Sequence, residues 1–176
     1  MRISGGNLRG RRIPDFNWGG TKPSTEKTRL GLMNFLMHNI SIKDSKMLDL
    51  FAGTGLVGLE FLSRGGKELF SLDKNAKAVN YMLEIKNFFK LDYWTIKCFD
   101  IEIENFDLMD SYEIIFADPP YEYAQMDELI AKIILSNLLA EDGLFILEHR
   151  SSRIFNLHLP YKSSKYGEST ISFFKK

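Results

Sequence analysis

Residues 46–58 read KMLDLFAGTGLVG, an apolar run that leads directly into three closely spaced glycines. The apolar run predicts a buried β-strand, and the glycines predict a tight turn whose backbone can approach a ligand. The residues from Leu56 to Arg64 then follow a helical pattern, which Gly65 and Gly66 end. The sequence here therefore predicts a strand, a glycine turn and a helix, in that order.

The alternation of strands and helices continues along most of the chain. Further strands are predicted at residues 68–72, 93–98, 112–117 and 144–147. The first of these ends at Asp73. Further helices are predicted after Asn75, running to about Leu91, and through Leu129, Ile130, Ile133, Ile134 and Leu138. The predicted fold class is α/β: a doubly wound, Rossmann-like and mainly parallel sheet with helices on both faces.

Both ends of the chain differ from this pattern. Residues 154–174 have no helical signal, and two short alternating stretches that flank residues 163–165 predict a closing antiparallel hairpin. Residues 1–23 hold several glycines and basic residues, which predicts a short basic N-terminal arm or small hairpin rather than part of the core. Ser24 or Thr25 can cap the helix that follows.

Length and composition restrict the protein class. A chain of 176 residues with 44% hydrophobic residues can build one full core, so residues 24–176 are expected to form a single domain. The only cysteine, Cys98, excludes an intrachain disulfide, and the three histidines show no ligand spacing, so no metal is expected. No apolar run approaches membrane-spanning length. We therefore expect a cytoplasmic protein without a membrane partner, and a monomer, because no apolar stripe exceeds the needs of a core.

Charge is unevenly distributed although the formal net charge is zero. Residues 1–29 carry seven Lys and Arg against two acids, and residues 150–176 carry six against one. The segment between them is acidic. If the fold brings the two basic ends together, they would attract a polyanion such as a nucleic acid to one region; the alternative interpretation is a solvated surface.

The glycine turn suggests a nucleotide-containing ligand. Residues 53–58 form G-x-G-x-x-G, and Asp73 follows about twenty residues later, where it can accept hydrogen bonds from ribose hydroxyls. The turn suits the pyrophosphate of NAD or the carboxylate of S-adenosylmethionine. Asp49 favours S-adenosylmethionine, because a strand carboxylate suits its ammonium group and is poorly placed beside phosphates; otherwise Asp49 braces the turn. Asp100 can accept a hydrogen bond from the adenine amine of the cofactor; the alternative is a solvated loop aspartate.

Residues 118–121 read DPPY and follow the apolar run that ends at Ala117. Two prolines cannot continue a central strand, so this segment is stiff and its carbonyl groups are free to accept hydrogen bonds. Asp118 and the Pro119 carbonyl can accept both hydrogens of a planar amine, and Tyr121 can stack on its ring. The segment thus predicts a nucleobase site at a strand end, where open α/β sheets place their chemistry. The alternative is an ordinary turn with a rim aromatic.

These motifs resemble a known family. DLFAGTG at residues 49–55 together with DPPY resembles the class I S-adenosylmethionine-dependent amino-methyltransferases. A narrower resemblance, to the RsmD-type small-subunit ribosomal RNA guanine-N2 methyltransferases, rests on MRISGGNLRGR at 1–11, KPSTEKTR at 22–29, NFL at 34–36, LEH at 147–149 and YGEST at 166–170. It spans nearly the whole chain. Lys22 stands where the family usually has Arg, and Leu30 where Glu is common.

The resemblance implies a class I methyltransferase sheet, S-adenosylmethionine as cofactor, and methyl transfer to the exocyclic N2 amine of a guanine in small-subunit ribosomal RNA. The RNA partner is either free or part of a partly assembled subunit. The expected cofactor-binding residues are Asp49, Phe51, Gly53, Gly55, Asp73 and Asp100. The expected catalytic residues are Asp118, Pro119 and Tyr121. The expected phosphate contacts are Arg2, Arg9, Arg11, Arg12, Lys22 and Arg29.

Several alternatives stay open at the level of sequence. An adenine-N6 methyltransferase acting on DNA or RNA is the nearest one, because DPPY serves that amine as well. A further alternative is a protein methyltransferase that modifies glutamine, but the basic N-terminus would have no role in such an enzyme. A scaffold that binds nucleic acid without catalysis is the alternative of another class, and the intact Asp49, glycines and Asp118 argue against it. Glu148 and His149 either line the pocket or cap the last parallel strand.

Overall fold

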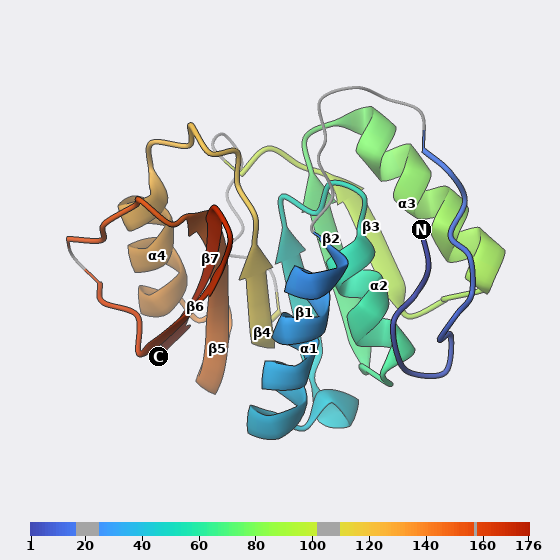
Figure 1. Cartoon of the computed structure of the whole chain (residues 1–176), viewed down its shortest axis with the longest axis horizontal. Helices are drawn as coiled ribbons and strands as arrows, with labels where there is room; N and C mark the ends of the chain where they lie inside the picture. Colours follow the sequence, from blue (N-terminus) through green and yellow to red (C-terminus); the bar gives the residue numbers. More distant parts are fainter. Residues whose placement is uncertain (17–24, 102–109, 157) are drawn as a thin grey trace.

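The computed structural model describes residues 1–16, 25–101, 110–156 and 158–176. One seven-stranded sheet has the order β3-β2-β1-β4-β5-β7-β6 (Figure 1). Its strands are β1 (Lys46–Leu50), β2 (Glu68–Asp73), β3 (Trp94–Cys98), β4 (Tyr112–Ala117), β5 (Leu139–Arg150), β6 (Lys162–Tyr166) and β7 (Ser169–Lys175). The helices are α1 (Glu26–Asn39), α2 (Leu56–Ser63), α3 (Ala76–Phe89) and α4 (Met126–Leu135), with a short 3₁₀ turn at Ile42–Asp44.

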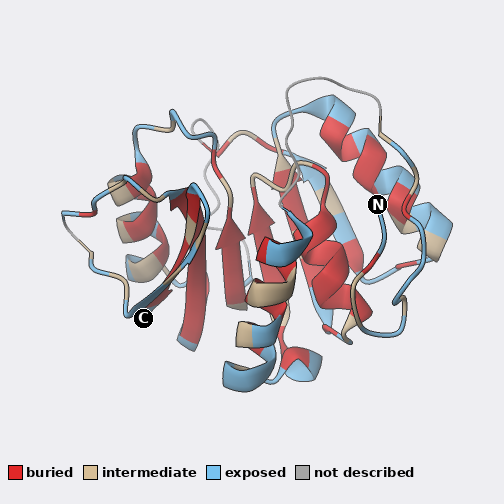
Figure 2. Cartoon of the chain, in the orientation of Figure 1, coloured by how far each residue is buried: buried red, intermediate tan, exposed pale blue. Residues whose placement is uncertain are grey.

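Strands β1 to β5 are parallel, and β7 and β6 continue the sheet antiparallel. Helices α1, α2 and α3 pack into a core on one face, while α4 packs into a second core on the other. The central strands are buried on both faces (Figure 2), as expected for a parallel sheet between helix layers. The predicted fold class is confirmed. The sheet order reverses between β1 and β4, where doubly wound folds place their ligand crevice.

The predicted elements are present, but three boundaries were wrong. Strand β5, predicted at 144–147, runs from Leu139 to Arg150 and contains Gly143. Helix α4 ends at Leu135, so Leu138 is not helical and instead accepts from the backbone of Tyr112 beside β5. The C-terminal hairpin turns at residues 167–168 rather than 163–165, since Gly167 has φ of 67° and residues 163–165 pair with β7. A left-handed backbone conformation is easiest for glycine, which explains the position of this turn.

The N-terminus forms the predicted small hairpin, in which Arg2 and Arg12 face each other. The expectation that it lies outside the core was wrong, because Ile3 and Ile13 are each only 2% exposed and belong to the α1–α3 core. Thr25 caps α1 as predicted, with its hydroxyl accepting from the backbone N–H of Thr28. The N-terminal hairpin is therefore an integral layer over α2 rather than a loose arm.

Candidate active site

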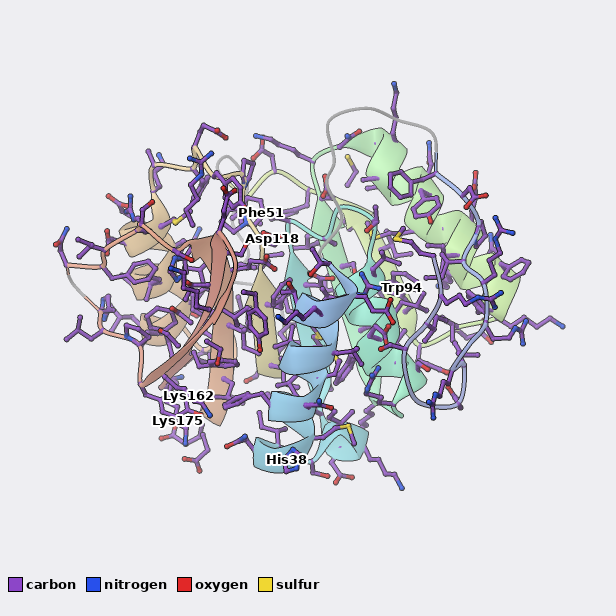
Figure 3. The ribbon with its side chains drawn as sticks, in the orientation of Figure 1. His38, Phe51, Trp94, Asp118, Lys162 and Lys175 are labelled. Atoms are coloured by element: carbon purple, nitrogen blue, oxygen red, sulfur yellow. The ribbon has the colours of Figure 1, made fainter. Side chains whose placement is uncertain are left out.

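A cavity of about 710 Å³ opens at the carboxyl edge of the sheet, beside the ends of β1, β2, β4 and β5. Both predicted motifs reach it: residues 51–54 of the glycine turn form one wall, and residues 118–121 form another. Figure 3 shows Phe51 and Asp118 next to each other at this edge. The fold thus joins two motifs that are more than sixty residues apart in the sequence.

The glycine turn is held by the end of the neighbouring strand. The backbone N–H of Gly53 donates to Asp73 at 2.7 Å, and that of Asn75 donates to the other carboxylate oxygen at 2.8 Å. Phe51 and Gly53 have φ of 58° and 54°, a strained conformation for a phenylalanine. Each Asp73 oxygen keeps a lone pair for a further donor. Phe51, Gly53 and Asp73, for which the sequence predicts a role in cofactor binding, line the cavity.

Gly55 shapes the turn without lining the cavity. Its φ is 68°, and a methyl group placed on it would lie 2.9 Å from the buried Trp94 ring and 2.8 Å from Met82. Real Cβ atoms do not approach this closely. Glycine is therefore required here both for backbone conformation and for packing.

Asp49 lies beneath the turn, 1% exposed, and is not among the described residues that line the cavity. The backbone N–H of Gly58 in α2 is close enough to this carboxylate to oppose the rise in its pKa. Neither carboxylate oxygen, however, has a hydrogen-bond partner of normal geometry among the described residues. Burial, together with the charge of Asp73, raises the pKa of Asp49 to about 8. An unpaired buried carboxylate is costly, so this site is suited to a cation arriving above the turn.

Asp118 and Pro119 form the opposite wall, immediately after β4. Burial raises the pKa of Asp118 well above its usual value, and the charges of Glu148 and Asp49 add to this effect. Glu148 also lines the cavity. Carboxylates gathered in this way favour ligands that bring hydrogen-bond donors or positive charge.

Tyr121 stands at the cavity rim, 40% exposed, and is fixed at two points. Its hydroxyl lies 3.0 Å from the hydroxyl of Ser169 on β7, and the guanidinium of Arg150 lies 4.8 Å from the centre of its ring. A cation over an aromatic face is attracted to it. The ring is therefore held in one orientation, which suits it for stacking on a planar ligand.

The sequence prediction missed several residues of the cavity wall, among them Thr28 of α1, Tyr166 of β6 and Ser169 of β7. It also missed Arg150, which is not part of the lining but holds the Tyr121 ring. Arg150 and Ser169 are paired terminal residues of adjacent strands. Only the position of Arg150 at a strand end, two residues after Glu148, could have indicated its role. Asp100, which was predicted, lines the cavity and forms an ion pair with Lys74 at 3.8 Å.

The predicted phosphate-binding residues separate into three groups. Arg2, Arg9, Arg11 and Arg12 are exposed on the N-terminal hairpin. Lys22 lies outside the described residues. Arg29 is only 3% exposed and forms an ion pair with Glu60 of α2 at 3.8 Å, so its prediction as a phosphate contact is contradicted. Glu60 also accepts from the backbone and hydroxyl of Ser4, so Arg29 helps to hold the hairpin against two helices.

The hairpin does not overhang the cavity. The backbone N–H of Asn7 donates to Ser63 at the far end of α2, whereas Leu56 at the near end lines the cavity. Eight helical residues span about 12 Å. Figure 1 also shows the C-terminal hairpin at the opposite side of the sheet from the N-terminal hairpin, so the exposed arginines of residues 1–16 do not lie beside it. Within the basic segment 1–29, the start of α1 does reach the C-terminal segment, because Thr28 and Tyr166 line the same cavity.

Among the described residues, no cluster of His, Cys, Asp and Glu could hold a metal ion. No helix in the part of the chain that the structure describes is long and apolar enough to cross a membrane.

Comparisons with known proteins agree with this geometry. The family model described as conserved hypothetical protein 95 matches residues 1–175. Ribosomal RNA small subunit methyltransferase D of Escherichia coli K12 is 34% identical over 157 residues, covering 84% of this chain and 74% of that protein. The protein of the same name from Haemophilus influenzae is 29% identical over 159 residues, covering 84% and 78%.

A solved structure of a hypothetical protein from Thermus thermophilus superposes with a TM-score of 0.85 at 25% identity, covering 100% of this chain and 99% of that one. The similarity thus extends over the N-terminal hairpin, the glycine turn, the DPPY segment and the C-terminal hairpin. On these grounds the chain belongs to the ribosomal RNA small subunit methyltransferase D family.

Proposed function

We propose that this protein transfers a methyl group from S-adenosylmethionine to the exocyclic N2 amine of a guanine in small-subunit ribosomal RNA. The observation that carries the proposal is the meeting of the glycine turn and the Asp118-Pro119 acceptors in one cavity. The names of the relatives supply the RNA class, which the cavity by itself does not specify.

The residues present fit the cofactor. Asp49 offers two buried oxygens without hydrogen-bond partners beneath the turn, which suits the positive charges of the ammonium and sulfonium groups. The remaining lone pairs of Asp73 suit the ribose hydroxyls, and Asp100 suits the adenine amine. When bound, S-adenosylmethionine supplies an activated methyl group on a sulfonium centre. The cavity volume of about 710 Å³ lies within the usual range for small-molecule sites.

The chain's own residues then orient the acceptor. An exocyclic amine is a weak nucleophile because its lone pair is conjugated with the ring. If Asp118 and the Pro119 carbonyl each accept one of its hydrogens, the nitrogen becomes more pyramidal and its lone pair points toward the methyl group. Geometry of this kind is a large part of the acceleration of a two-reactant step. Tyr121, held by Ser169 and Arg150, fixes the plane of the base.

Proton balance also involves Asp118. As the N–CH₃ bond forms and the S–CH₃ bond breaks, the nitrogen must lose one proton. Because burial and the charges of Glu148 and Asp49 raise the pKa of Asp118, its carboxylate is a stronger proton acceptor than an exposed aspartate. One residue thus orients the amine and accepts its proton.

The target nucleotide must be unpaired or extruded before its amine can enter the cavity. Extrusion from a duplex costs roughly a few kcal/mol, and stacking on Tyr121 returns about 1–3 kcal/mol. We therefore expect a loop nucleotide. The exposed arginines of the N-terminal hairpin would then contact phosphates roughly one helix length, about 12 Å, from the cavity.

The proposal is tested on small ribosomal subunits and on naked ribosomal RNA, both isolated from cells that lack this protein. Purified protein and labelled S-adenosylmethionine are added, and the RNA is hydrolysed and analysed by mass spectrometry. We expect N2-methylguanosine at one position from one of the two substrates. N6-methyladenosine would establish the adenine alternative, and the absence of cofactor binding at millimolar concentration would support the scaffold.

Asp118→Ala sharpens this test. We expect methyl transfer to fall at least about 1000-fold, because the amine loses both its orientation and its proton acceptor. Cofactor affinity, measured by calorimetry, should stay within a few-fold of wild type. Asp92→Ala, at an exposed position after α3, is the matched control and should retain full activity. Equal activity of the two variants would contradict the role of Asp118.

A further inference from the structure

Glu148 occupies a position that the proposed mechanism leaves unused. Parallel pairing of β4 with β5 sets Ala117 opposite Leu147, so the next residues, Asp118 and Glu148, are neighbours at the carboxyl ends of the two strands. Both line the cavity, and Glu148 is only 6% exposed. Glu148 thus brings a carboxylate to the same wall of the cavity as Asp118.

The wall at this point presents acceptors side by side. Burial is the main cause of the raised pKa of Asp118, and the charge of Glu148 adds to it, as expected for two carboxyl groups on neighbouring strand ends. The Pro119 carbonyl follows directly in the chain. A ligand that fills this corner must therefore present several adjacent hydrogen-bond donors along one edge.

Guanine is the base that satisfies this demand. Its N2 amine is adjacent to the ring N1–H, so three hydrogens point outward along one edge. The N6 amine of adenine is flanked by the acceptors N1 and N7, and the N4 amine of cytosine has the acceptor N3 beside it. An acidic side chain next to the amine-binding residues would thus pair with guanine and face lone pairs on the other two bases.

We propose that Glu148 is the residue that selects guanine, with its carboxylate accepting the N1–H of the target base while Asp118 and the Pro119 carbonyl accept from the N2 amine. The inference rests on the proposed function and names the feature that separates guanine N2 from adenine N6.

The orientation of Tyr121 supports this arrangement. Arg150, which covers one face of the Tyr121 ring, is on β5 two residues after Glu148, and Ser169, which contacts the Tyr121 hydroxyl, pairs with Arg150 across β5 and β7. The aromatic plane and the acceptor edge are therefore both fixed by the end of the same strand. Stacking on Tyr121 would therefore set the plane of the base, and Glu148 would set which edge of the base faces the wall.

The test compares Glu148→Gln and Glu148→Met on the substrate, subunit or naked RNA, that wild type methylates. Gln keeps a neutral acceptor, whereas Met keeps the approximate volume without one. We expect kcat for N2-methylguanosine formation to fall about tenfold in Glu148→Gln and about 100-fold in Glu148→Met, as for loss of a hydrogen bond to a charged group. Calorimetric affinity for S-adenosylhomocysteine should stay within about twofold. Glu141→Gln, an exposed glutamate on the same strand, should behave as wild type.

A second measurement addresses the N1 position directly. In 2-aminopurine the amine stays at C2 but N1 carries no hydrogen, so a carboxylate at Glu148 should disfavour it. RNA with 2-aminopurine at the methylated position is assembled by ligation, and its fluorescence reports docking of the base even without turnover. We expect wild type to bind this RNA at least tenfold more weakly than the guanine RNA. In Glu148→Gln the difference in affinity between the guanine RNA and the 2-aminopurine RNA should be smaller, since the glutamine amide can donate to N1.

The outcomes distinguish the inference from the function beneath it. If wild type forms no N2-methylguanosine, the proposed function fails. If wild type forms it and both Glu148 variants match Glu141→Gln, the selection role is wrong. A third outcome is that the Glu148 variants bind S-adenosylhomocysteine more weakly but distinguish 2-aminopurine RNA from guanine RNA as wild type does. That outcome would place Glu148 at the cofactor and would also overturn the inference.

Discussion

The two halves of the cavity are built differently. In the half formed by β1 and β2, a glycine turn with Phe51 and Gly53 at positive φ brings backbone to the cavity. Its N–H groups at Ala52 and Gly53 donate to the Leu72 carbonyl and the Asp73 carboxylate. In the half formed by β4, β5 and β7, the surface is mostly side chains, with Asp118, Glu148 and Tyr121 brought together from different strands.

This difference matches the two ligands we propose. A cofactor that never varies is suited to a rigid glycine turn with a few acidic side chains around it. A nucleotide must be distinguished from three others, and that requires side-chain acceptors in a defined order. The following predictions test the contrast between the backbone half and the side-chain half, from the largest effect to the smallest.

Gly55→Ala tests the backbone half. A methyl group there meets Trp94 and Met82 below 3 Å and also strains the left-handed backbone, so we expect a loss of about 2–4 kcal/mol in the free energy of unfolding and at least 100-fold weaker cofactor binding. Gly10→Ala is the matched control, because its φ is also positive but no atom lies within 4 Å. It should lose only about 1 kcal/mol and bind cofactor normally. Thermal unfolding and calorimetry measure both quantities.

Asp49→Asn should have opposite effects on the stability of the protein and on its affinity for the cofactor. The pKa of Asp49 is raised to about 8, so its protonated form stabilises the native state fully below pH 4, and that contribution is lost as pH rises toward 8. The side chain of the variant does not titrate. Its free energy of unfolding should therefore equal that of wild type near pH 4 and exceed it by a few kcal/mol at pH 8.

The same variant should bind S-adenosylmethionine more weakly at pH 8, because the carboxylate beneath the turn is gone. Asp92→Asn, at an exposed site, provides the control for a change in net charge. A pH-independent difference between Asp49→Asn and wild type would mean that Asp49 is already ionised and paired in the native protein.

Tyr121→Ala tests the side-chain half. Loss of stacking should raise KM for RNA about 10–100-fold while cofactor affinity is unchanged. Tyr121→Phe keeps the ring and loses only the contact with Ser169, so its effect should be within a few-fold of wild type. Tyr161→Ala, at an aromatic residue that is 47% exposed and outside the cavity, serves as control. An equal effect of the Ala and Phe variants at residue 121 would argue against stacking.

Arg9→Ala should have the smallest effect. Removing one phosphate contact is expected to weaken RNA binding two- to threefold at moderate salt and to lower the slope of log affinity against log salt by about one. Lys132→Ala, on α4 at the other face of the sheet, should leave the slope unchanged. Deleting residues 1–20 would not be a clean test, because it also removes Ile3 and Ile13 from the core.

Parts of the site were predictable because their signals are local. The apolar run before Asp118 and the prolines after it identify a strand end, and the glycine spacing identifies a ligand-binding turn. Arg29 was predicted wrongly because a basic residue in a basic segment gives no sign of burial. Its partner, Glu60, is thirty-one residues away, and only the packing of α1 on α2 brings the two together.

The sequence by itself determined the order of strands and helices, the two motifs and the family, because these depend on residue spacing along the chain. Only the tertiary structure decided which residues share the cavity. Glu148 is beside Asp118 because β4 and β5 pair in one register, and Arg150 covers Tyr121 because β5 ends at that rim. A shift of either strand by one residue would turn these side chains to the other face of the sheet. Strand register is a property of the assembled sheet, which no local stretch of sequence encodes.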